Sequence, residues 1–242
     1  SFKPVIEYAI NSSDAVTTVS KNLKKVTLEN FNIKKEIDYV PNFIDLKLYQ
    51  KKFNKHLRSS YADEDEHILT HISNFRKVKR IKDVIDVFYN ASKNVKCKLL
   101  MIGDGPDRLA AEQLCRKYGI SNKVKFLGKL KLIENILSFA DIFILPSETE
   151  SFGLVALEAM ASRTVVISTN SGGLPEVNLD MKTGYLSNVG DIKKMSKDVC
   201  NLLSDNELLK KMKNNAFEHS KSFDLPNILP QYEEIYNKLL KK

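Results

Sequence analysis

Cysteine and histidine are scarce in this 242-residue sequence, which has three cysteines, four histidines and no tryptophan. Cys97, Cys115 and Cys200 lie far apart and form no CxxC pair, so they predict reduced, mostly buried thiols rather than a disulfide framework or a zinc site. His67 and His71 have the i,i+4 spacing of a metal-binding pair on a helix. The segment HILTHIS is typical of a strand, however, and we expect no metal site.

Long apolar runs are also absent, because no stretch approaches the roughly 20 apolar residues of a membrane-spanning helix. The first residues, Ser1-Phe2-Lys3-Pro4, have neither the apolar segment nor the small-residue cleavage site of a secretory signal peptide. Together with the unpaired cysteines, these absences lead us to expect a cytoplasmic protein without a membrane span.

Lysine is abundant, and the formal net charge is +8 at pH 7. Such a charge can mark a protein that binds nucleic acid or a membrane surface. The lysines are scattered over the surfaces of predicted helices, however, and no aromatic residues are interleaved with them as in RNA-binding motifs. We therefore expect no nucleic-acid partner, but a local basic site for a phosphate-bearing ligand. Examples of the scattered pairs are Lys24-Lys25, Lys34-Lys35, Lys193-Lys194 and Lys210-Lys211.

From residue 67 onward, short apolar segments alternate with amphipathic ones, which predicts an α/β fold. Several of the apolar segments, such as 98–102 and 142–145, are of the kind that is buried on both faces of a parallel sheet. The alternation therefore predicts a Rossmann-like, doubly wound parallel sheet covered by helices. We expect strands at 67–73, 97–102, 123–127, 141–145 and 164–168, and helices at 81–94, 106–118, 132–139, 153–161 and 191–204.

Two regions flank this alternation. The turn Pro41–Asp45 and a polar, lysine-rich stretch to about Asp65 predict a boundary between two domains. The last predicted helix lies outside the strand–helix alternation, after the segment Phe223–Pro226. The elements expected in the flanks are helices at 4–12, 21–32, 206–221 and 227–240 and strands at 14–19 and 37–40.

Four predicted loops carry residues suited to a ligand, because an open parallel sheet binds ligands beyond the carboxyl ends of its strands. In the first, Arg76-Lys77-Val78-Lys79-Arg80 places four cations in five positions just before a helix. This pattern predicts an anion site, although a solvated basic turn is an equal alternative. The segments Gly103–Pro106 and Phe126–Leu130 are weaker signals, since structural turns explain them as well.

The fourth loop, Pro146–Met160, is the most informative segment of the chain. It follows an apolar strand and opens a helix, so the backbone N–H groups of residues 152–154 are predicted to face an anion at the helix start. Glu150 lies just before that helix, and Glu158 lies about one and a half turns into it. Carboxylates accept charge-assisted hydrogen bonds from sugar and ribose hydroxyls, so the two could bracket one bound molecule. Taken one at a time, each glutamate is also explained as a charge at the start or on the surface of a helix.

This loop resembles that of the family-four retaining glycosyltransferases, whose GT-B architecture places two Rossmann-like domains across a cleft. The resemblance covers roughly residues 36–240 and rests mainly on an E-x7-E element from Glu150 to Glu158 with an intervening FGL. The linker Pro41–Asp45, the basic loop, GDGP, FLG and the segment Gly172–Glu176 also match. Within the family, segments 71–80 and 147–154 are most similar to the enzymes that transfer N-acetylglucosamine from UDP to L-malate in bacillithiol biosynthesis.

The resemblance implies roles for individual residues. Lys79 matches the family lysine on the donor diphosphate, and Arg76 is expected to supply the charge of a family arginine whose place Asn74 takes here. Glu150 matches the carboxylate on the donor sugar, and Glu158 matches the one on the ribose. The other expected contacts are Gly103 in the GDGP loop, Lys129 and Leu130 beside the uracil, and the backbone of Phe152, Gly153 and Leu154 at the phosphates.

The resemblance further implies a retaining transferase that moves a sugar, N-acetylglucosamine, from a UDP-sugar donor to a small hydroxyl acceptor, L-malate, without cofactor or metal. Residues 1–45 would be a remnant of the acceptor domain and linker, 46–222 the nucleotide-sugar-binding domain, and 223–242 a helix that crosses back. No counterpart of the family's acceptor residues is found in the sequence, so we expect the chain alone to bind donor without transferring sugar. A non-catalytic nucleotide- or nucleic-acid-binding module is the alternative, and a homo-oligomer is left open.

Overall fold

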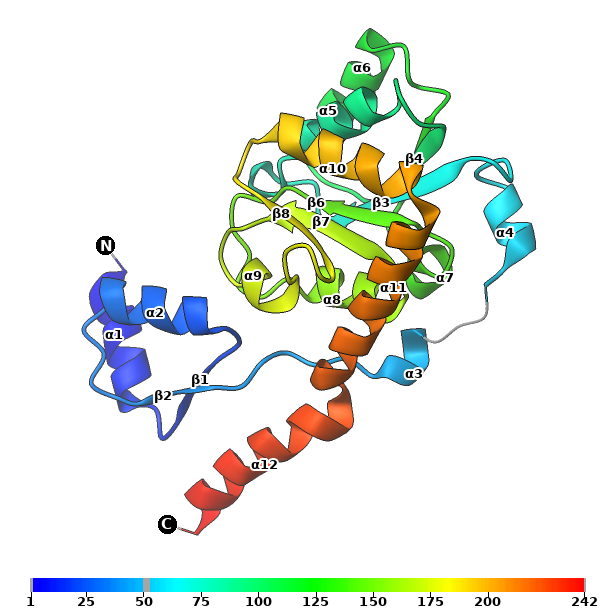
Figure 1. The fold of residues 1–242 in the computed structure, drawn as a ribbon. Coiled ribbons are helices and arrows are strands. Elements are labelled where there is room, and N and C mark those ends of the chain that lie inside the picture. Colours follow the sequence, from blue (N-terminus) through cyan, green and yellow to red (C-terminus); the bar gives the residue numbers. More distant parts are fainter. Residues whose placement is uncertain (1, 50–52, 242) are drawn as a thin grey trace.

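A six-stranded parallel sheet forms the centre of the computed structural model, which describes residues 2–49 and 53–241. The strands lie in the order β5–β4–β3–β6–β7–β8, and every neighbouring pair runs parallel (Figure 1). The predicted Rossmann-like, doubly wound fold is therefore confirmed. The strands are β3 (His67–Ser73), β4 (Cys97–Gly103), β5 (Val124–Gly128), β6 (Ile142–Leu145), β7 (Val165–Thr169) and β8 (Gly184–Ser187).

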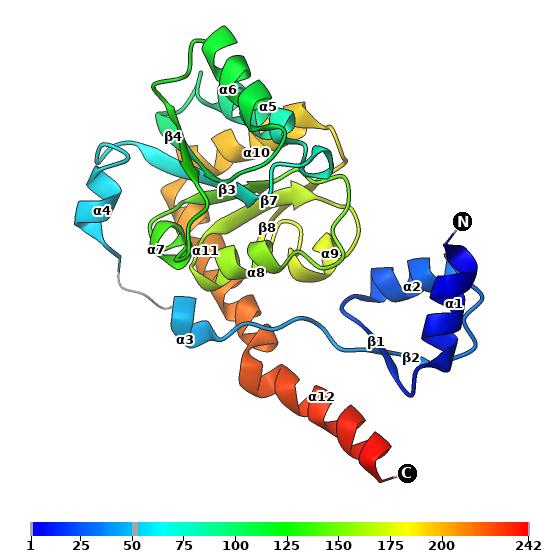
Figure 2. The same cartoon turned by 180° about the vertical axis from the view of Figure 1, so that it is seen from behind.

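Helices cover both faces of this sheet (Figures 1 and 2). A long helix, α11 (Asn206–Ser220), contributes to the cores on both sides, with Met212 in one core and Ala216 in the other. The remaining helices pack as two layers, α5 (Ile81–Ala91), α6 (Arg108–Lys117) and α10 (Ile192–Ser204) on one face, and α7 (Glu134–Leu137), α8 (Leu154–Ala161) and α9 (Leu174–Val177) on the other.

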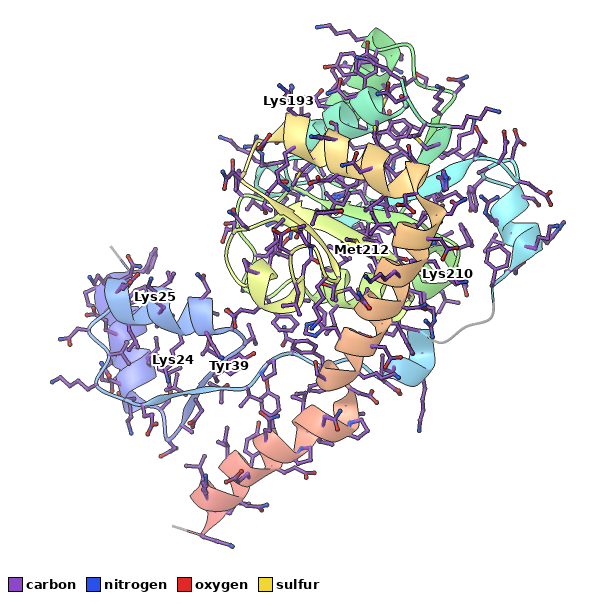
Figure 3. The ribbon with its side chains drawn as sticks, viewed as in Figure 1. Lys24, Lys25, Tyr39, Lys193, Lys210 and Met212 are labelled. Atoms are coloured by element: carbon purple, nitrogen blue, oxygen red, sulfur yellow. The ribbon has the colours of Figure 1, made fainter. Side chains whose placement is uncertain are left out.

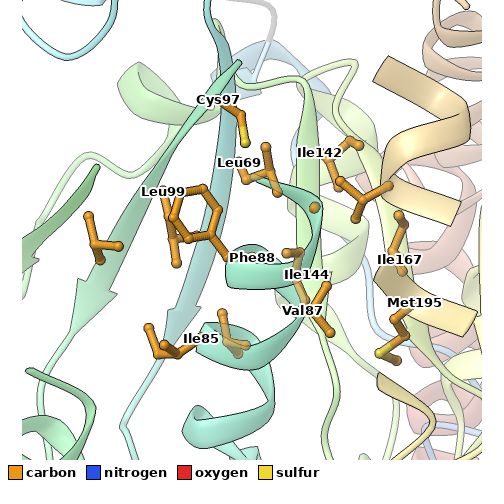
Figure 4. Close-up of a cluster of buried hydrophobic side chains, with 14 of the residues drawn as sticks. Leu69, Ile85, Val87, Phe88, Cys97, Leu99, Ile142, Ile144, Ile167 and Met195 are labelled. Carbon is orange, nitrogen blue, oxygen red and sulfur yellow. The ribbon is translucent and has the colours of Figure 1, made fainter. Parts of the chain in front are cut away.

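Successive side chains of the central strands enter the two cores alternately, as the period of two along a strand requires. In β3, Leu69 joins the core beneath α5 and α10, whereas Ile68 and Ile72 join the core beneath α8. Figure 4 shows part of the first core, where Leu69 and Ile144 of the sheet lie with Phe88 of α5. Both faces are thus buried, which explains the continuous apolar runs in strands such as β4 and β6.

All the predicted elements have the predicted type, and their ends differ from the prediction by at most three residues. The helix predicted at 132–139 is shortened at both ends, because only Glu134–Leu137 is helical. Strand β8 and helix α9 lie where the sequence predicts no element. The same is true of two short helices in the lysine-rich stretch, α3 (Leu46–Tyr49) and α4 (Lys55–Ser59).

Residues 2–40 form a small unit beside the sheet, here called the N-terminal unit (Figures 1 and 2). Its two strands pair in parallel, with Val16 opposite Ile37. Glu176 of α9 connects this unit to the sheet, because its carboxylate accepts hydrogen bonds from the amides of Lys21 (2.9 Å) and Asn22 (2.8 Å). The elements of the unit are α1 (Lys3–Ser12), β1 (Val16–Thr18), α2 (Lys21–Asn30) and β2 (Ile37–Tyr39).

The chain crosses between the N-terminal unit and the sheet twice, and the two crossings lie side by side. The Ile44 amide donates to the carbonyl oxygen of Phe223 (3.0 Å), and the Leu225 amide donates to that of Ile44 (2.8 Å). The second crossing passes from η2 (Lys221–Phe223) into α12 (Leu225–Leu240), which lies along the N-terminal unit (Figure 1). Both crossings therefore share one short stretch of backbone pairing.

The basic side chains are spread over several elements. Figure 3 shows Lys24 and Lys25 on α2, Lys193 on α10 and Lys210 on α11. In the part of the chain that the structure describes, no helix has both the length and the apolar composition of a membrane span. The three cysteines are free thiols, and burial raises the pKa of Cys97 to about 12.

Asp141 joins the amino-terminal ends of β3 and β6, at the end of the sheet opposite the loops with the predicted site residues. Its carboxylate accepts hydrogen bonds from the Ile68 amide (2.9 Å) and Lys213 Nζ (2.6 Å), and its Oδ2 lies 3.3 Å from His67 Nδ1. Burial by itself raises the pKa of Asp141. The contact with His67 and the charge of Lys213 outweigh it, and they hold the pKa well below its usual range.

We expect Asp141→Asn to lower the free energy of unfolding at pH 7 by about 2 kcal/mol, because the ionised partner of Lys213 is lost. The folded-state pKa lies below the unfolded-state value, so this stabilisation is fully present above about pH 4 and is lost as the pH falls further. Urea unfolding of both proteins at pH 7 and pH 3 measures the effect. A difference that stays the same at both values would contradict a role for the ionised carboxylate.

Candidate active site

A cavity of about 310 Å³ lies between the carboxyl ends of β3 and β6. These neighbouring strands continue in opposite directions across the sheet, since β3 leads to β4 and β6 leads to β7. Their loops diverge, and such a switch point is where open α/β sheets hold their ligands. The cavity is lined by Asn42, Ile72, Ser73, Asn74, Lys79, Leu145, Glu150, Ser151, Phe152, Gly153, Leu154 and Val155.

The loop after β3 has an unusual backbone. Phe75 (φ 41°) and Arg80 (φ 51°) adopt the left-handed conformation that residues other than glycine rarely adopt. Between them, the short turn η1 (Lys77–Lys79) is closed by the Lys79 amide, which donates to Arg76 O (2.7 Å). Phe75 is fully buried, and this anchors the loop. The turn directs Lys79 into the cavity.

The glycines of the GDGP segment support this loop from the neighbouring strand. A Cβ atom at Gly103 would lie 1.8 Å from Ser73 O, and one at Gly105 would lie 2.0 Å from Asn74 O. The Asp107 amide also donates to Phe75 O (3.0 Å). Gly103 is therefore needed for the close approach of the ends of β3 and β4, and it is not among the residues that line the cavity.

The loop after β6 is supported in the same way from β7. Gly172 lies so close that a Cβ atom there would be 2.0 Å from Glu150 O, and the Gly173 amide donates to that oxygen (2.8 Å). The two central loops are also joined, because the Glu148 amide donates to Val78 O (2.8 Å). The loop after β3 thus contacts the loops after β4 and β6, and the loop after β6 contacts the loops after β3 and β7.

Lys79 and Glu150, both predicted site residues, meet inside the cavity. Lys79 Nζ lies 2.5 Å from Glu150 Oε1, and both side chains are largely buried, at 21% and 14% exposure. The buried hydroxyl of Ser147 donates to the same oxygen (2.9 Å). The described residues form no hydrogen bond to Glu150 Oε2. The pair therefore offers a cation and a carboxylate oxygen to one ligand.

The start of α8 adds further donors beside this pair. Gly153 (φ 97°) precedes the helix, and Ala156 is the first residue whose amide donates within it, to Gly153 O (2.9 Å). The amides of Leu154 and Val155 come before that bond, at the positive end of the helix dipole. Together with Lys79, they make this side of the cavity suited to an anion.

His71 orients a serine at the cavity wall. Its ring is fully buried, its Nδ1 donates to Ile144 O (2.8 Å), and its Nε2 then accepts from Ser73 Oγ (2.8 Å). Burial lowers the pKa of His71 to about 4, so the ring is neutral at pH 7. His67 contacts Asp141 instead, so each histidine of the HILTHIS segment has its own protein partner.

Five of the predicted site residues do not line this cavity: Arg76, Gly103, Lys129, Leu130 and Glu158. Arg76, Lys129 and Leu130 are exposed, the last two just after the edge strand β5. Glu158 is half-buried on α8 and accepts a hydrogen bond from Tyr49 (2.9 Å). No role was predicted for Ser73, Asn42 or Tyr49, because their contributions depend on tertiary contacts.

Comparison with known proteins places the chain among glycosyltransferases. Residues 52–219 match the family described as glycosyl transferases group 1. The chain is 42% identical over 243 residues to N-acetyl-alpha-D-glucosaminyl L-malate synthase of Bacillus anthracis, an alignment that covers 100% of this chain and 64% of that protein. A D-inositol 3-phosphate glycosyltransferase of Corynebacterium urealyticum is 36% identical over 141 residues, which cover 57% of this chain and 33% of the relative.

Solved structures show the same fold at lower identity. Anabaena Alr3699/HepE in complex with UDP and glucose superposes with a TM-score of 0.91 at 21% identity, covering 97% of this chain and 66% of that one. Sucrose-phosphate synthase from Thermosynechococcus elongatus gives a TM-score of 0.89 at 24% identity, covering 98% and 61%. The chain spans less than two thirds of the length of the synthase from B. anthracis. The resemblance inferred from the loop motifs is confirmed, and the chain belongs to the glycosyl transferases group 1 family.

Proposed function

We propose that the chain holds the donor site of a retaining glycosyltransferase that transfers N-acetylglucosamine from UDP to L-malate. The 42% identity to the B. anthracis synthase over the whole chain supports this donor and this acceptor. The solved structure of Anabaena Alr3699/HepE with UDP, which has the same fold, supports the nucleotide. Residues 46–222 would form the donor domain, with residues 1–45 and 223–242 belonging to the acceptor side.

The observation that carries the proposal is the Lys79–Glu150 pair beside the start of α8. A nucleotide sugar presents a diphosphate directly next to sugar hydroxyls, so its site needs a cation next to an acceptor of hydrogen bonds. Lys79 and the first amides of α8 suit the diphosphate. Glu150 Oε2 suits a sugar hydroxyl, because an ionised carboxylate only accepts hydrogen bonds.

In the proposed reaction, the bond between the anomeric carbon and the diphosphate oxygen breaks, and the acceptor oxygen bonds to that carbon. Lys79 and the α8 amides stabilise the negative charge that develops on the departing diphosphate. The acceptor attacks from the face on which the diphosphate leaves, so its proton passes to a diphosphate oxygen. Glu150 positions the sugar throughout, since Lys79 and Ser147 hold its Oε1.

The remaining expected contacts stay part of the proposal. Glu158 would bind the ribose, and Lys129 and Leu130 would border the uracil. Arg76 is exposed and lies outside the cavity lining, so we assign it a weaker, long-range effect on the diphosphate than Lys79 has. Binding of UDP, ADP and uridine to this chain tests the nucleotide, and transfer of labelled N-acetylglucosamine by the full-length protein tests malate against other hydroxy acids. Tighter binding of ADP than of UDP would contradict the proposed donor.

Glu150→Gln separates the sugar from the nucleotide. We expect it to weaken UDP-N-acetylglucosamine relative to UDP about tenfold, because a charge-assisted hydrogen bond to the sugar is lost. UDP itself should bind at least as tightly as before, since the substitution releases Lys79 from its ion pair. Calorimetry with both ligands measures the ratio.

Glu148→Gln is the matched control for this experiment. Glu148 lies two residues away, pairs with Arg80 (3.3 Å) and is not among the residues that line the cavity. Its substitution should leave the ratio of the two affinities unchanged. Equal weakening of UDP and the sugar donor by Glu150→Gln would show that Glu150 does not contact the sugar.

A further inference from the structure

Tyr49 and Glu158 form a hydrogen bond between two elements that are far apart in the sequence. Tyr49, at the end of α3, donates from its hydroxyl to Glu158 Oε1 (2.9 Å), and both side chains are half-buried. We propose that Tyr49 is a positioning residue that orients the Glu158 carboxylate toward the ribose hydroxyls of the donor. This inference rests on the proposed function, in which Glu158 binds the ribose.

The geometry of α8 places Glu158 on the ligand side of the helix. Leu154 and Val155 line the cavity, and Glu158 follows them by four and three residues, so it lies one turn further along the same face. The opposite side of α8 is buried in the core through Ala156 and Met160. A nucleotide whose diphosphate binds at the helix start can therefore extend along this face toward Glu158.

Tyr49 also opposes the rise in the pKa of Glu158, which is raised overall. Burial raises the pKa of Glu158, and the charge of Glu134 raises it further, whereas the hydrogen bond from Tyr49 lowers it. The pKa of Tyr49 is raised well above its usual range, by its own burial and by Glu158, so its hydroxyl remains a donor at neutral pH. With Oε1 held by Tyr49, Oε2 can accept from a ribose hydroxyl.

The position of Tyr49 is fixed by the crossing between the sheet and the N-terminal unit. Leu46, the first residue of α3, is buried, and its amide donates to Asp224 Oδ1 (3.1 Å) at the start of α12. The same carboxylate oxygen accepts from the Leu225 amide (3.0 Å). The short helix that carries Tyr49 is thus fastened at its other end, which gives the hydroxyl a defined place.

The test compares UDP with 2′,3′-dideoxy-UDP, which lacks both ribose hydroxyls. In the unmodified chain, UDP should bind at least about tenfold more tightly than 2′,3′-dideoxy-UDP, because one charge-assisted hydrogen bond contributes about this much to affinity. We expect Tyr49→Phe to reduce this ratio at least threefold while leaving the affinity for 2′,3′-dideoxy-UDP unchanged. A tyrosine that only packs would weaken both ligands alike and leave the ratio as it was.

Tyr61→Phe is the control, because Tyr61 packs at the edge of the same core as Tyr49 and stacks on Phe139 (6.0 Å). It should leave the ratio unchanged. Glu158→Gln tests the assignment of Glu158 to the ribose separately from the role of Tyr49. If it leaves the preference for UDP intact, the ribose assignment itself is wrong. If it abolishes the preference and Tyr49→Phe does not alter it, only the role of Tyr49 is wrong.

Acidification gives a second readout. The groups that act on the Glu158 carboxylate are Tyr49 and Glu134. Loss of the Tyr49 hydroxyl removes the bond that lowers the pKa of Glu158, so the carboxylate is protonated at higher pH in Tyr49→Phe. As the pH is lowered, the preference for UDP over 2′,3′-dideoxy-UDP should therefore start to decline at a higher pH in this variant than in the unmodified chain. Superimposable pH profiles would overturn the proposal.

Discussion

Lys79→Gln should weaken UDP binding about 100-fold and leave uridine binding unchanged, because uridine lacks the diphosphate that the lysine contacts. Two effects combine in this loss. The cation is removed, and Glu150 is left as an unpaired carboxylate in a largely buried position, where it repels the phosphates. Calorimetry with UDP and uridine measures both affinities on the same protein.

Three further variants locate the effect. Lys77→Gln removes an exposed cation from the same turn and should change UDP binding less than about threefold, as expected for a solvent-screened charge. Arg76→Gln should behave similarly, since Arg76 is exposed and outside the cavity lining. The double variant Lys79→Gln/Glu150→Gln should recover part of the loss. If uridine weakens as much as UDP in Lys79→Gln, the lysine does not act on the diphosphate.

Gly103→Ala should lower the free energy of unfolding by about 4 kcal/mol, the sum of backbone strain and overpacking. Gly103 has φ +118°, and the added Cβ atom would lie 1.8 Å from Ser73 O. Because Ser73 lines the cavity and ends the strand that leads into the loop with Lys79, the displacement should also weaken UDP. Urea unfolding and UDP binding of the folded variant measure the two effects.

Gly119→Ala is the matched control for the clash. Gly119 also has a positive φ, +68°, but a Cβ atom there meets nothing within 4 Å. It should cost only about 1 kcal/mol, which is the backbone strain alone. Equal destabilisation by the two alanines would show that the close approach of Gly103 to Ser73 contributes nothing to stability.

The fold was predictable where strands are buried on both faces. β4, β6 and β7 contain uninterrupted apolar runs, so the parallel pairing of these buried strands follows from the pattern. β8 was missed because it is an edge strand with one partner, and its central residues, Tyr185 and Leu186, are only half-buried. A strand that is partly exposed need not carry an apolar run.

The site was predictable only to the level of loops. The sequence placed Lys79 in a basic loop and Glu150 before a helix, but the two lie 71 positions apart, so their contact is tertiary. The left-handed backbone at Phe75 and Arg80 determines which cation of the basic loop faces the cavity. The pattern of charges in the sequence does not reveal this choice. Arg80 instead pairs with Asp83 (2.5 Å).

The strand order determines when this site can form during folding. β3–β5 and β6–β8 are two halves whose strands are adjacent in both sequence and space. Joining them brings together residues 73 positions apart, such as His71 and Ile144, and the entropy of closing so long a loop favours late formation. Lys79 and Glu150 belong to different halves, so neither half alone contains the ion pair. UDP would then bind only the completed sheet and stabilise it by mass action.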